Sequence, residues 1–279
     1  MKKITLVPIG GLGNRMLAVS SFISYCSKNN YFLEIQWGKD NGLACSFSDL
    51  FQPFSVENVE LKEISGTGKF IWDFPRKQNL WLSYFFQSFL FDKRIYSKAY
   101  LDTAEGKKPA GVTSIDVFDK KTHNSKSVYV AACRDLFSEN TLHLPPVTDL
   151  INSLIEEITA AFSPRTIGLH IRRTDHIHSI KNNPTELYIQ KMNEELDKNP
   201  DTSFFVASDS IEEKQRLIEI YNEKIITSMQ EVRRDSAEGI QYALAEIYAL
   251  SRTEKIYGSR HSTFSIVASK LSQKENCLF

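Results

Sequence analysis

Two adjacent arginines follow a short apolar segment in the middle of the chain. The sequence 170–175 (HIRRTD) begins inside the apolar run 166–171, which predicts a buried strand. In open α/β sheets, ligands bind beyond the carboxyl ends of the strands, and arginine grips phosphate with a rigid fork of N–H donors. Arg172 and Arg173 therefore indicate an anion site. Surface arginines paired with nearby acids are an equally good interpretation of the pair taken alone.

His170 and Asp175 flank these arginines. Alternate residues of an extended segment share a face, so we expect His170 to face the same ligand as Arg172. The carboxylate of Asp175 can orient a guanidinium or accept hydrogen bonds from a sugar or a base.

Two further polar segments follow predicted strands. Asp209 follows the strand 203–207, where its carboxylate can accept from a guanine N–H or a ribose hydroxyl, or cap the helix expected from residue 211. The segment 258–265 (GSRHSTFS) follows another strand and opens a helix, whose free N–H groups favour anions. A hydroxyl-rich capping turn is the alternative. The candidate donor-binding residues in this segment are Ser259, His261, Ser262 and Thr263.

The three segments taken together indicate one ligand site. One carries arginines, one a carboxylate and one hydroxyls before a helix, and all three follow successive predicted strands. Because the carboxyl ends of parallel strands meet at one edge of a sheet, this combination predicts a site for a nucleoside diphosphate.

A glycine loop near the start is a fourth candidate. The sequence 10–16 (GGLGNRM) follows a strand and precedes a helix, but it matches neither G-x-G-x-x-G nor a P-loop. Gly11 and Gly13 would let the backbone approach a ligand closely, or simply form a tight strand–helix turn. Asn14 is expected either to face the ligand or to cap the helix.

The elements that position these residues alternate along the chain. Residues 3–9, 14–28 and 31–37 predict one strand–helix–strand unit. After Leu144-Pro145-Pro146 the pattern becomes regular, so we divide the chain into domains 1–146 and 147–279. Strands are predicted at 166–171, 203–207, 223–227 and 255–257, and helices at 150–162, 185–196, 211–221, 237–250 and 263–271. This alternation predicts a parallel sheet covered on both faces.

Composition narrows the class of protein. The 279 residues are 42% hydrophobic and 24% charged with zero formal net charge, which is typical of a globular enzyme and argues against general nucleic-acid binding. The four cysteines form no C-x-x-C pair, so no zinc or redox motif is indicated. The apolar run 80–91 (LWLSYFFQSFLF) is too short to span a bilayer. We expect a core helix there, with peripheral membrane or partner contact as the alternative.

The motifs at 10–16, 170–175 and 258–265, together with FVASDS at 205–210, resemble those of the α1,2/α1,6/protein-O-fucosyltransferase superfamily, most closely the bacterial α1,2- and nodulation-type α1,6-fucosyltransferases. The resemblance covers the start of the chain and about 165–269. It implies a GT-B-like α/β fold of two Rossmann-like domains facing a cleft, with the first on the acceptor side and the second binding the nucleotide sugar. It also implies inverting transfer of fucose from GDP-fucose to a glycan hydroxyl.

The resemblance further implies residue roles. Arg173, helped by Arg172, would hold the β-phosphate, His170 would lie near the ribose or guanine, and Asp209 would read guanine. Ser262 and Thr263 would bind the diphosphate, and Gly11, Gly13 and Asn14 would face the cleft. No cofactor or metal is implied, in agreement with the lack of a D-x-D signature. Arg233 and Arg234 are weaker candidates, for which a solvated pair is the simpler interpretation.

The general base is not settled by the sequence. Related α1,6-type enzymes carry a glutamate soon after the arginine motif, whereas this chain has histidines and no glutamate before Glu186. Asp175, His178 and Glu186 are the candidates. The alternatives to the assignment as a whole are another nucleotide-sugar transferase of GT-B fold and a non-catalytic nucleotide- or glycan-binding protein. The absence of an evident membrane anchor leads us to expect a bacterial cytoplasmic enzyme.

Overall fold

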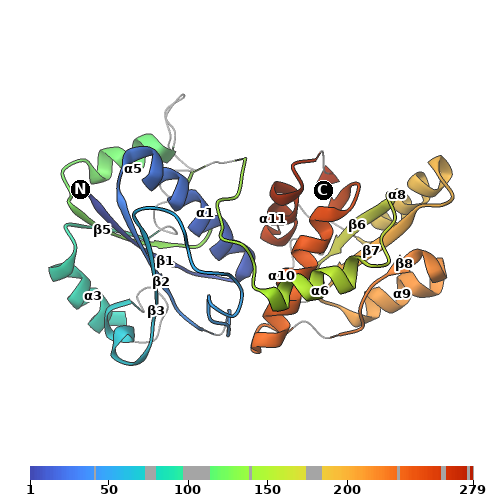
Figure 1. The fold of residues 1–279 in the computed structure, drawn as a ribbon, viewed down its shortest axis with the longest axis horizontal. Helices are drawn as coiled ribbons and strands as arrows, with labels where there is room; N and C mark the ends of the chain where they lie inside the picture. The colour runs from blue at the N-terminus through green and yellow to red at the C-terminus, as the bar shows by residue number, and fades with distance from the viewer. Residues whose placement is uncertain are drawn as a thin grey trace. The chain divides into compact units, whose positions relative to one another are not determined.

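A computed structural model describes most of the chain: residues 1–40, 42–72, 80–96, 114–137, 140–173, 184–230, 233–258, 262–274 and 277–278. The chain divides into two compact units, Met1–Pro146 and Val147–Phe279. Each unit is built around its own parallel β-sheet with helices packed on it (Figure 1).

The sheet of the first unit has the strand order β3-β2-β1-β5-β4, and all neighbouring strands in it are parallel. Its strands are β1 (Lys3–Pro8), β2 (Phe32–Trp37), β3 (Val59–Glu63), β4 (Lys93–Tyr96) and β5 (Ser127–Ala132). The order reverses between β1 and β5, so the loop after β1 lies at the switch point where α/β sheets bind ligands.

Helices cover both faces of this sheet. On one face, aromatic rings of α1 (Leu12–Asn29) and α5 (Ser114–Thr122) pack edge to face, Phe22 against Phe118. On the other face, Tyr129 of β5 packs against Trp72 at the end of α2 (Lys69–Trp72), after the short 3-10 turn η1 (Gly66–Gly68). Helix α3 (Leu80–Leu90) follows α2.

The sheet of the second unit has the order β10-β9-β6-β7-β8, again with all pairs parallel. Its strands are β6 (Thr166–Ile171), β7 (Ser203–Ser208), β8 (Ile225–Ile226), β9 (Ile256–Gly258) and β10 (Cys277–Leu278). Strand β6 lies between β7 and β9, and the switch point is between β6 and β9.

Alternate residues of β6 face different helices of this unit. Leu169 belongs to a core cluster with Tyr188 and Leu217, which come from α8 and α9. A Cβ on Gly168 would lie within 3 Å of Leu250, at the end of α10, so only glycine lets that helix approach so closely. The helices are α6 (Asp149–Thr159), α8 (Thr185–Lys198), α9 (Ile211–Tyr221), α10 (Ala237–Arg252) and α11 (Thr263–Ser272), and the 3-10 turn η2 (Asn222–Lys224) follows α9.

The predicted α/β class is thereby confirmed, and the predicted elements of the second half match the observed ones to within a few residues. Two predictions in the first half are wrong. Asn14 does not cap the first helix, which begins at Leu12 with Gly11 at its N-cap. The run 80–91 does form a helix, but the helix exposes its aromatic rings instead of burying them in the core.

Candidate functional site

The strands that precede the predicted polar segments of the second unit end at one carboxyl edge of its sheet. The register pairs the ends of β6 and β7, His170 opposite Ala207 and Ile171 opposite Ser208. Strand β9 runs on the other side of β6, with Tyr257 opposite Leu169. Arg172 and Arg173 after β6 and Asp209 after β7 therefore leave the sheet at the same edge, at which β9 also ends.

Arg173 is held by three groups there. Its Nε donates to Glu213 Oε1 at 2.8 Å, one terminal nitrogen donates to Thr185 Oγ1 at 2.9 Å, and the other to the carbonyl of Arg172 at 3.0 Å. The side chain is only 12% exposed. A guanidinium has five N–H donors, and these contacts use three of them. Arg173 is thus both a paired arginine and a fixed donor with capacity for an anion.

Glu213 is a further residue at this edge, and the sequence did not single it out. It lies three residues after Ser210, the N-cap of α9, and Ser210 Oγ accepts from the Glu213 backbone N–H. Its carboxylate accepts from both Arg173 and Thr185. The spacing Ser-x-x-Glu is that of a capping box, and this signal could have drawn attention to Glu213.

Asp209 links the ends of two strands. Its Oδ1 accepts from the backbone N–H of Arg173 at 2.7 Å, which ties the exit of β6 to the exit of β7. The capping alternative for Asp209 is wrong, because Ser210 occupies the N-cap of α9.

His170 bridges β6 to the helix that follows β9. Its Nδ1 lies 2.7 Å from Ser265 Oγ, and its ring stacks on Phe264 with centroids 4.6 Å apart. Burial lowers the pKa of His170 to about 4. The nearby carboxylate of Asp209 raises this pKa, but by less than burial lowers it. The imidazole is therefore neutral at neutral pH and supplies a hydrogen bond to this edge rather than a charge.

Ser262 stands at the N-cap of α11 without acting as a cap. Its side chain accepts no hydrogen bond from the helix, is 1% exposed, and has no hydrogen-bond partner for its Oγ among the described residues. A buried hydroxyl without a partner costs about 1–3 kcal/mol. Helix N-termini attract anions, and the first turn of α11, which begins at Thr263, holds no acidic residue.

Glu246 was also missed by the sequence reasoning. It lies on α10, is 2% exposed, and its Oε1 has no hydrogen-bond partner in the described part of the chain. Lys214 Nζ is 3.8 Å away, an ion pair too long for a hydrogen bond, and donates instead to the carbonyl of Ser228. Burial raises the pKa of Glu246 to about 7; Lys214 opposes this shift and Asp209 adds to it.

The glycine loop of the first unit is fixed by Arg15. This fully buried arginine donates to the carbonyls of Gly10 and Gly38 and to Asp40 Oδ1, and its guanidinium lies 5.2 Å from the ring centroid of Trp37. Gly11 and Gly13 lie at the start of α1, and Asn14 lies in its first turn. Arg15 therefore stabilises the conformation of the loop through these contacts.

Gly10 requires glycine for two reasons. Its φ is +85°, and a Cβ there would lie 2.7 Å from Asn14 Nδ2 and 2.9 Å from Cys133 Sγ. Gly66 offers a matched control, because its φ is also positive, +49°, but a Cβ there would meet nothing within 4 Å. We expect Gly10→Ala to lower the free energy of unfolding by about 2–3 kcal/mol and Gly66→Ala by about 1 kcal/mol. Equal shifts in urea denaturation would contradict this account of the loop.

Several predicted residues fall elsewhere. Asp175, His178, Ser259 and His261 lie outside the described residues. Glu186 is on the exposed surface of α8, where it pairs with Arg216 at 3.0 Å, so it is a poor candidate for a buried base.

The weaker arginine candidates are surface residues. Arg233 forms an exposed ion pair with Asp235 at 2.7 Å, and Arg234 is exposed beside it. In the described part of the chain, no group of three metal-ligating side chains gathers. No described helix is long and apolar enough to cross a bilayer.

The fold is similar to that of solved fucosyltransferases. NodZ α-1,6-fucosyltransferase soaked with GDP-fucose matches 97% of this chain with 93% of its own, at 15% identity and a TM-score of 0.59; another NodZ structure is from Bradyrhizobium. A variant of Arabidopsis thaliana FUT1 in complex with GDP matches 99% of this chain with 69% of its own, at 16% identity and 0.59. POFUT1 in complex with GDP matches 100% of this chain with 98% of its own, at 13% identity and a TM-score of 0.54. No protein-family model and no curated protein matches the sequence.

Proposed function

We propose that this chain is an inverting glycosyltransferase that moves fucose from GDP-fucose to a glycan hydroxyl. The observation that carries most weight is the buried hydroxyl of Ser262, which has no partner among the described residues and stands at the N-terminus of α11. The switch point between β6 and β9 is the expected ligand position in such a sheet. A diphosphate oxygen there would accept from Ser262 and from the free N–H groups of the helix.

The charge of the diphosphate would be met by the arginine segment. Arg173 is fixed by Glu213 and Thr185, so little side-chain entropy is lost when its remaining N–H groups bind phosphate. Arg172 would help from the neighbouring position. His170 is neutral, which suits a place near the ribose or the base better than one at the phosphates.

Guanine would be recognised by an acid at the same edge. Guanine presents N1–H and an exocyclic amine side by side, and a carboxylate accepts from both. Asp209 already accepts from the Arg173 backbone N–H, whereas Glu246 has a buried oxygen that accepts no hydrogen bond from the described residues and lies 3.8 Å from Lys214 Nζ. We therefore assign Glu246 as the principal reader of the base, with Asp209 beside it.

The choice of GDP-fucose, rather than another nucleotide sugar, is supported by the solved structures of similar fold, whose names report GDP or GDP-fucose. In this proposal residues 147–279 bind the donor, and residues 1–146 serve the acceptor. Gly11, Gly13 and Asn14, at the start of α1, would then lie on the acceptor side.

The reaction would be displacement of GDP from fucose C1 by the acceptor oxygen. Negative charge builds up on the leaving diphosphate, and the fixed arginines and N–H donors would stabilise it. Asp175 or His178 would take the acceptor proton. Because the arginines neutralise the leaving group, we expect transfer to persist in EDTA.

Two serines at helix N-caps make a sharp test. Ser236 caps α10 through a hydrogen bond from the Gly239 N–H, whereas Ser262 makes no such bond. We expect Ser262→Ala to weaken GDP binding about tenfold without loss of stability. Ser236→Ala is expected to lower the free energy of unfolding by about 1 kcal/mol and to leave GDP binding unchanged.

The measurement is isothermal titration calorimetry of GDP, GDP-fucose, GDP-mannose and UDP-glucose, in EDTA, followed by NMR of the product anomer. Selective binding of guanosine nucleotides with a preference for GDP-fucose would support the assignment. Preference for the uridine donor would indicate another nucleotide-sugar transferase, and binding without turnover would indicate a non-catalytic protein.

A further inference from the structure

Helix α3 exposes the side chains that a helix normally buries. Trp81 and Phe89 are each 74% exposed, and Phe85 is 53% exposed between them. Positions 81, 85 and 89 are four residues apart and so lie along one stripe of the helix. Phe85 also packs edge to face against Phe89. The three rings thus form an exposed aromatic stripe along the helix, which we call the α3 ridge.

The inward side of α3 is polar and fully satisfied. Ser83 and Gln87 are completely buried, and they donate to the carbonyls of Lys69 and Ile71. Gln87 Oε1 also accepts from the hydroxyl of Tyr96 at 2.9 Å. Hydrogen bonds from Ser83 and Gln87 therefore attach the helix to α2, and its exposed aromatic residues are not needed for this attachment. Its orientation is the reverse of that of a helix which packs an apolar stripe on a core.

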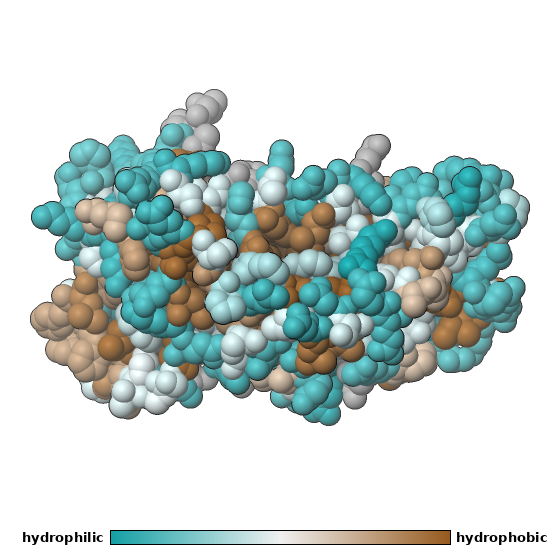
Figure 2. Space-filling model, in the orientation of Figure 1, coloured by the Kyte–Doolittle hydropathy of each residue, from teal (hydrophilic) through white to brown (hydrophobic). Residues whose placement is uncertain are grey.

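The apolar surface is visible from outside. Figure 2 shows tan and brown atoms gathered where Figure 1 labels α3. Tyr84, Phe86 and Leu90 are exposed as well. Helix α3 contains no acidic residue, so nothing within it opposes an anionic surface.

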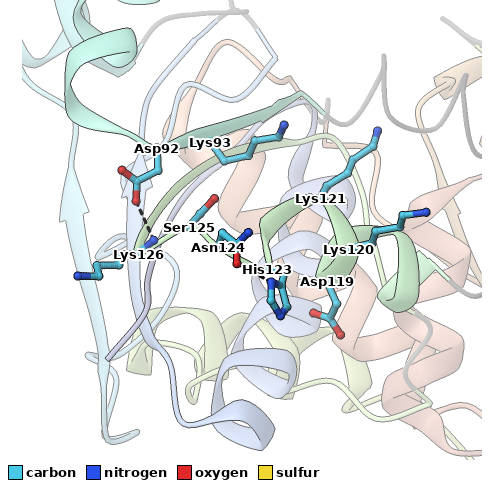
Figure 3. Close-up of a pocket in the computed structure, with 9 residues that line it drawn as sticks. All are labelled: Asp92, Lys93, Asp119, Lys120, Lys121, His123, Asn124, Ser125 and Lys126. Atoms are coloured by element: carbon cyan, nitrogen blue, oxygen red, sulfur yellow. Dashed lines mark hydrogen bonds between the residues drawn. The ribbon is translucent and has the colours of Figure 1, made fainter.

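A basic hollow adjoins the carboxyl end of α3. Its volume is about 930 Å³. The residues that line it are Asp92, Lys93, Asp119, Lys120, Lys121, His123, Asn124, Ser125 and Lys126. In Figure 3, Lys93 and Lys121 extend in the same direction, while Lys126 points to another side.

The hollow is joined to the helix by direct contacts. Asp92 lies two residues after the end of α3 and accepts from the backbone N–H groups of Lys126 and Ser127. Ser127 Oγ donates to the carbonyl of Leu90, the last residue of α3. Asp119, the second acid of the hollow, accepts from the hydroxyl of Tyr25. Both acids thus have structural partners, and the hollow is also lined by four lysines.

We propose that the α3 ridge and the lysine hollow form one docking surface for an anionic lipid bilayer. Tryptophan, tyrosine and phenylalanine on one helix face, beside lysines, are the pattern of a helix that lies in the membrane interface. The rings would enter the boundary of headgroups and acyl chains, and the lysines would contact lipid phosphates. This inference is independent of the donor site, because no residue of the second unit enters it.

A second copy of the chain is a less suitable occupant. A two-fold contact brings the same patch of both molecules together. Pairing through the α3 ridge would therefore draw the two lysine groups toward each other, and like charges would oppose the contact. An anionic lipid surface meets both the aromatic and the basic part of the face.

The test is co-sedimentation of the full chain with vesicles of phosphatidylcholine alone or mixed with phosphatidylglycerol. We expect binding to the mixed vesicles that weakens with salt, and little binding to phosphatidylcholine. Trp81→Ser combined with Phe89→Ser should reduce partitioning at least about tenfold, and so should Lys120→Gln combined with Lys121→Gln. Two matched controls should bind the vesicles as the wild type does. The control for the apolar face is Leu150→Ser, and the control for the charges is Lys198→Gln combined with Lys224→Gln.

A second measurement needs no disruptive variant. Trp81 is far more exposed than Trp37, so its fluorescence should shift to the blue on mixed vesicles and be quenched by brominated lipid, and Trp81→Phe should lose this signal. No binding by the wild type, or equal loss in the controls, would overturn the inference. Self-association in sedimentation velocity that depends on Trp81 and Phe89, without vesicle binding, would identify a second copy as the occupant instead.

Discussion

Replacing Arg173 with alanine is expected to lower the kcat for fucosyl transfer by about a hundred- to a thousandfold. The reason is that a fixed donor aimed at developing charge contributes this much in comparable oxyanion sites. Glu213 and Thr185 hold the guanidinium in place before any ligand arrives. Arg173→Lys should recover only a small part of the rate, since an ammonium keeps the charge but not the planar fork.

Arg216 is the matched control for this variant. It lies on α9 with Glu213, and its guanidinium pairs with Glu186, but both side chains are well exposed. Arg216→Ala should therefore leave kcat and stability nearly unchanged. Kinetics with saturating GDP-fucose would decide the matter: similar losses in the two variants would remove Arg173 from its proposed role.

Replacing Glu246 with glutamine is expected to weaken GDP binding about ten- to a hundredfold and to abolish the preference for GDP over IDP. Inosine lacks the exocyclic amine, so a carboxylate that accepts from both guanine donors discriminates between the two bases. Glutamine has one acceptor oxygen in place of two and turns an N–H donor toward the base. Glu238, exposed in the first turn of α10, supplies the control variant Glu238→Gln.

The same carboxylate predicts the pH dependence of binding. Burial raises the pKa of Glu246 to about 7 in the folded protein. Since guanine needs the ionised form, GDP affinity of the wild type should rise from pH 6 through pH 7 and level off about one pH unit above that pKa, whereas Glu246→Gln should show no such rise. A flat calorimetric profile for the wild type would remove Glu246 from base recognition.

The contribution of Glu246 to the free energy of unfolding should fall as the pH rises, whereas the GDP affinity should increase. The folded pKa of Glu246 lies above its unfolded value near 4.5, so the folded state binds the extra proton between about pH 4.5 and 7. This group therefore favours folding at the acidic end of that window, and its contribution is lost as pH rises through 7. Comparing urea denaturation of the wild type and Glu246→Gln across the window isolates this contribution from that of His170, which has the opposite sign.

Local pattern was enough to predict the strands and helices of the second unit. The apolar runs of β6 and β7 are buried along their length, and the helix α8 between them carries apolar residues at helical spacing. Parallel strands must end at a common edge, so Arg173, Asp209 and Ser262 could be assigned to one edge from the sequence. Their assignment to a nucleotide-sugar site rested on resemblance to a family of transferases.

The partners of these residues required the tertiary structure. Arg173 and Glu213 are 40 residues apart, and His170 and Ser265 are 95 apart, so no local pattern relates them. Glu246 looks like an ordinary helical glutamate in the sequence, and only the packing of α10 makes it a buried acid with an oxygen that accepts no hydrogen bond from the described residues. The exposure of helix α3 also could not be predicted from the sequence. An apolar run indicates that water is avoided, but only the fold decides whether a core covers it, and here the buried contacts of α3 are made by Ser83 and Gln87 while the rings face outward.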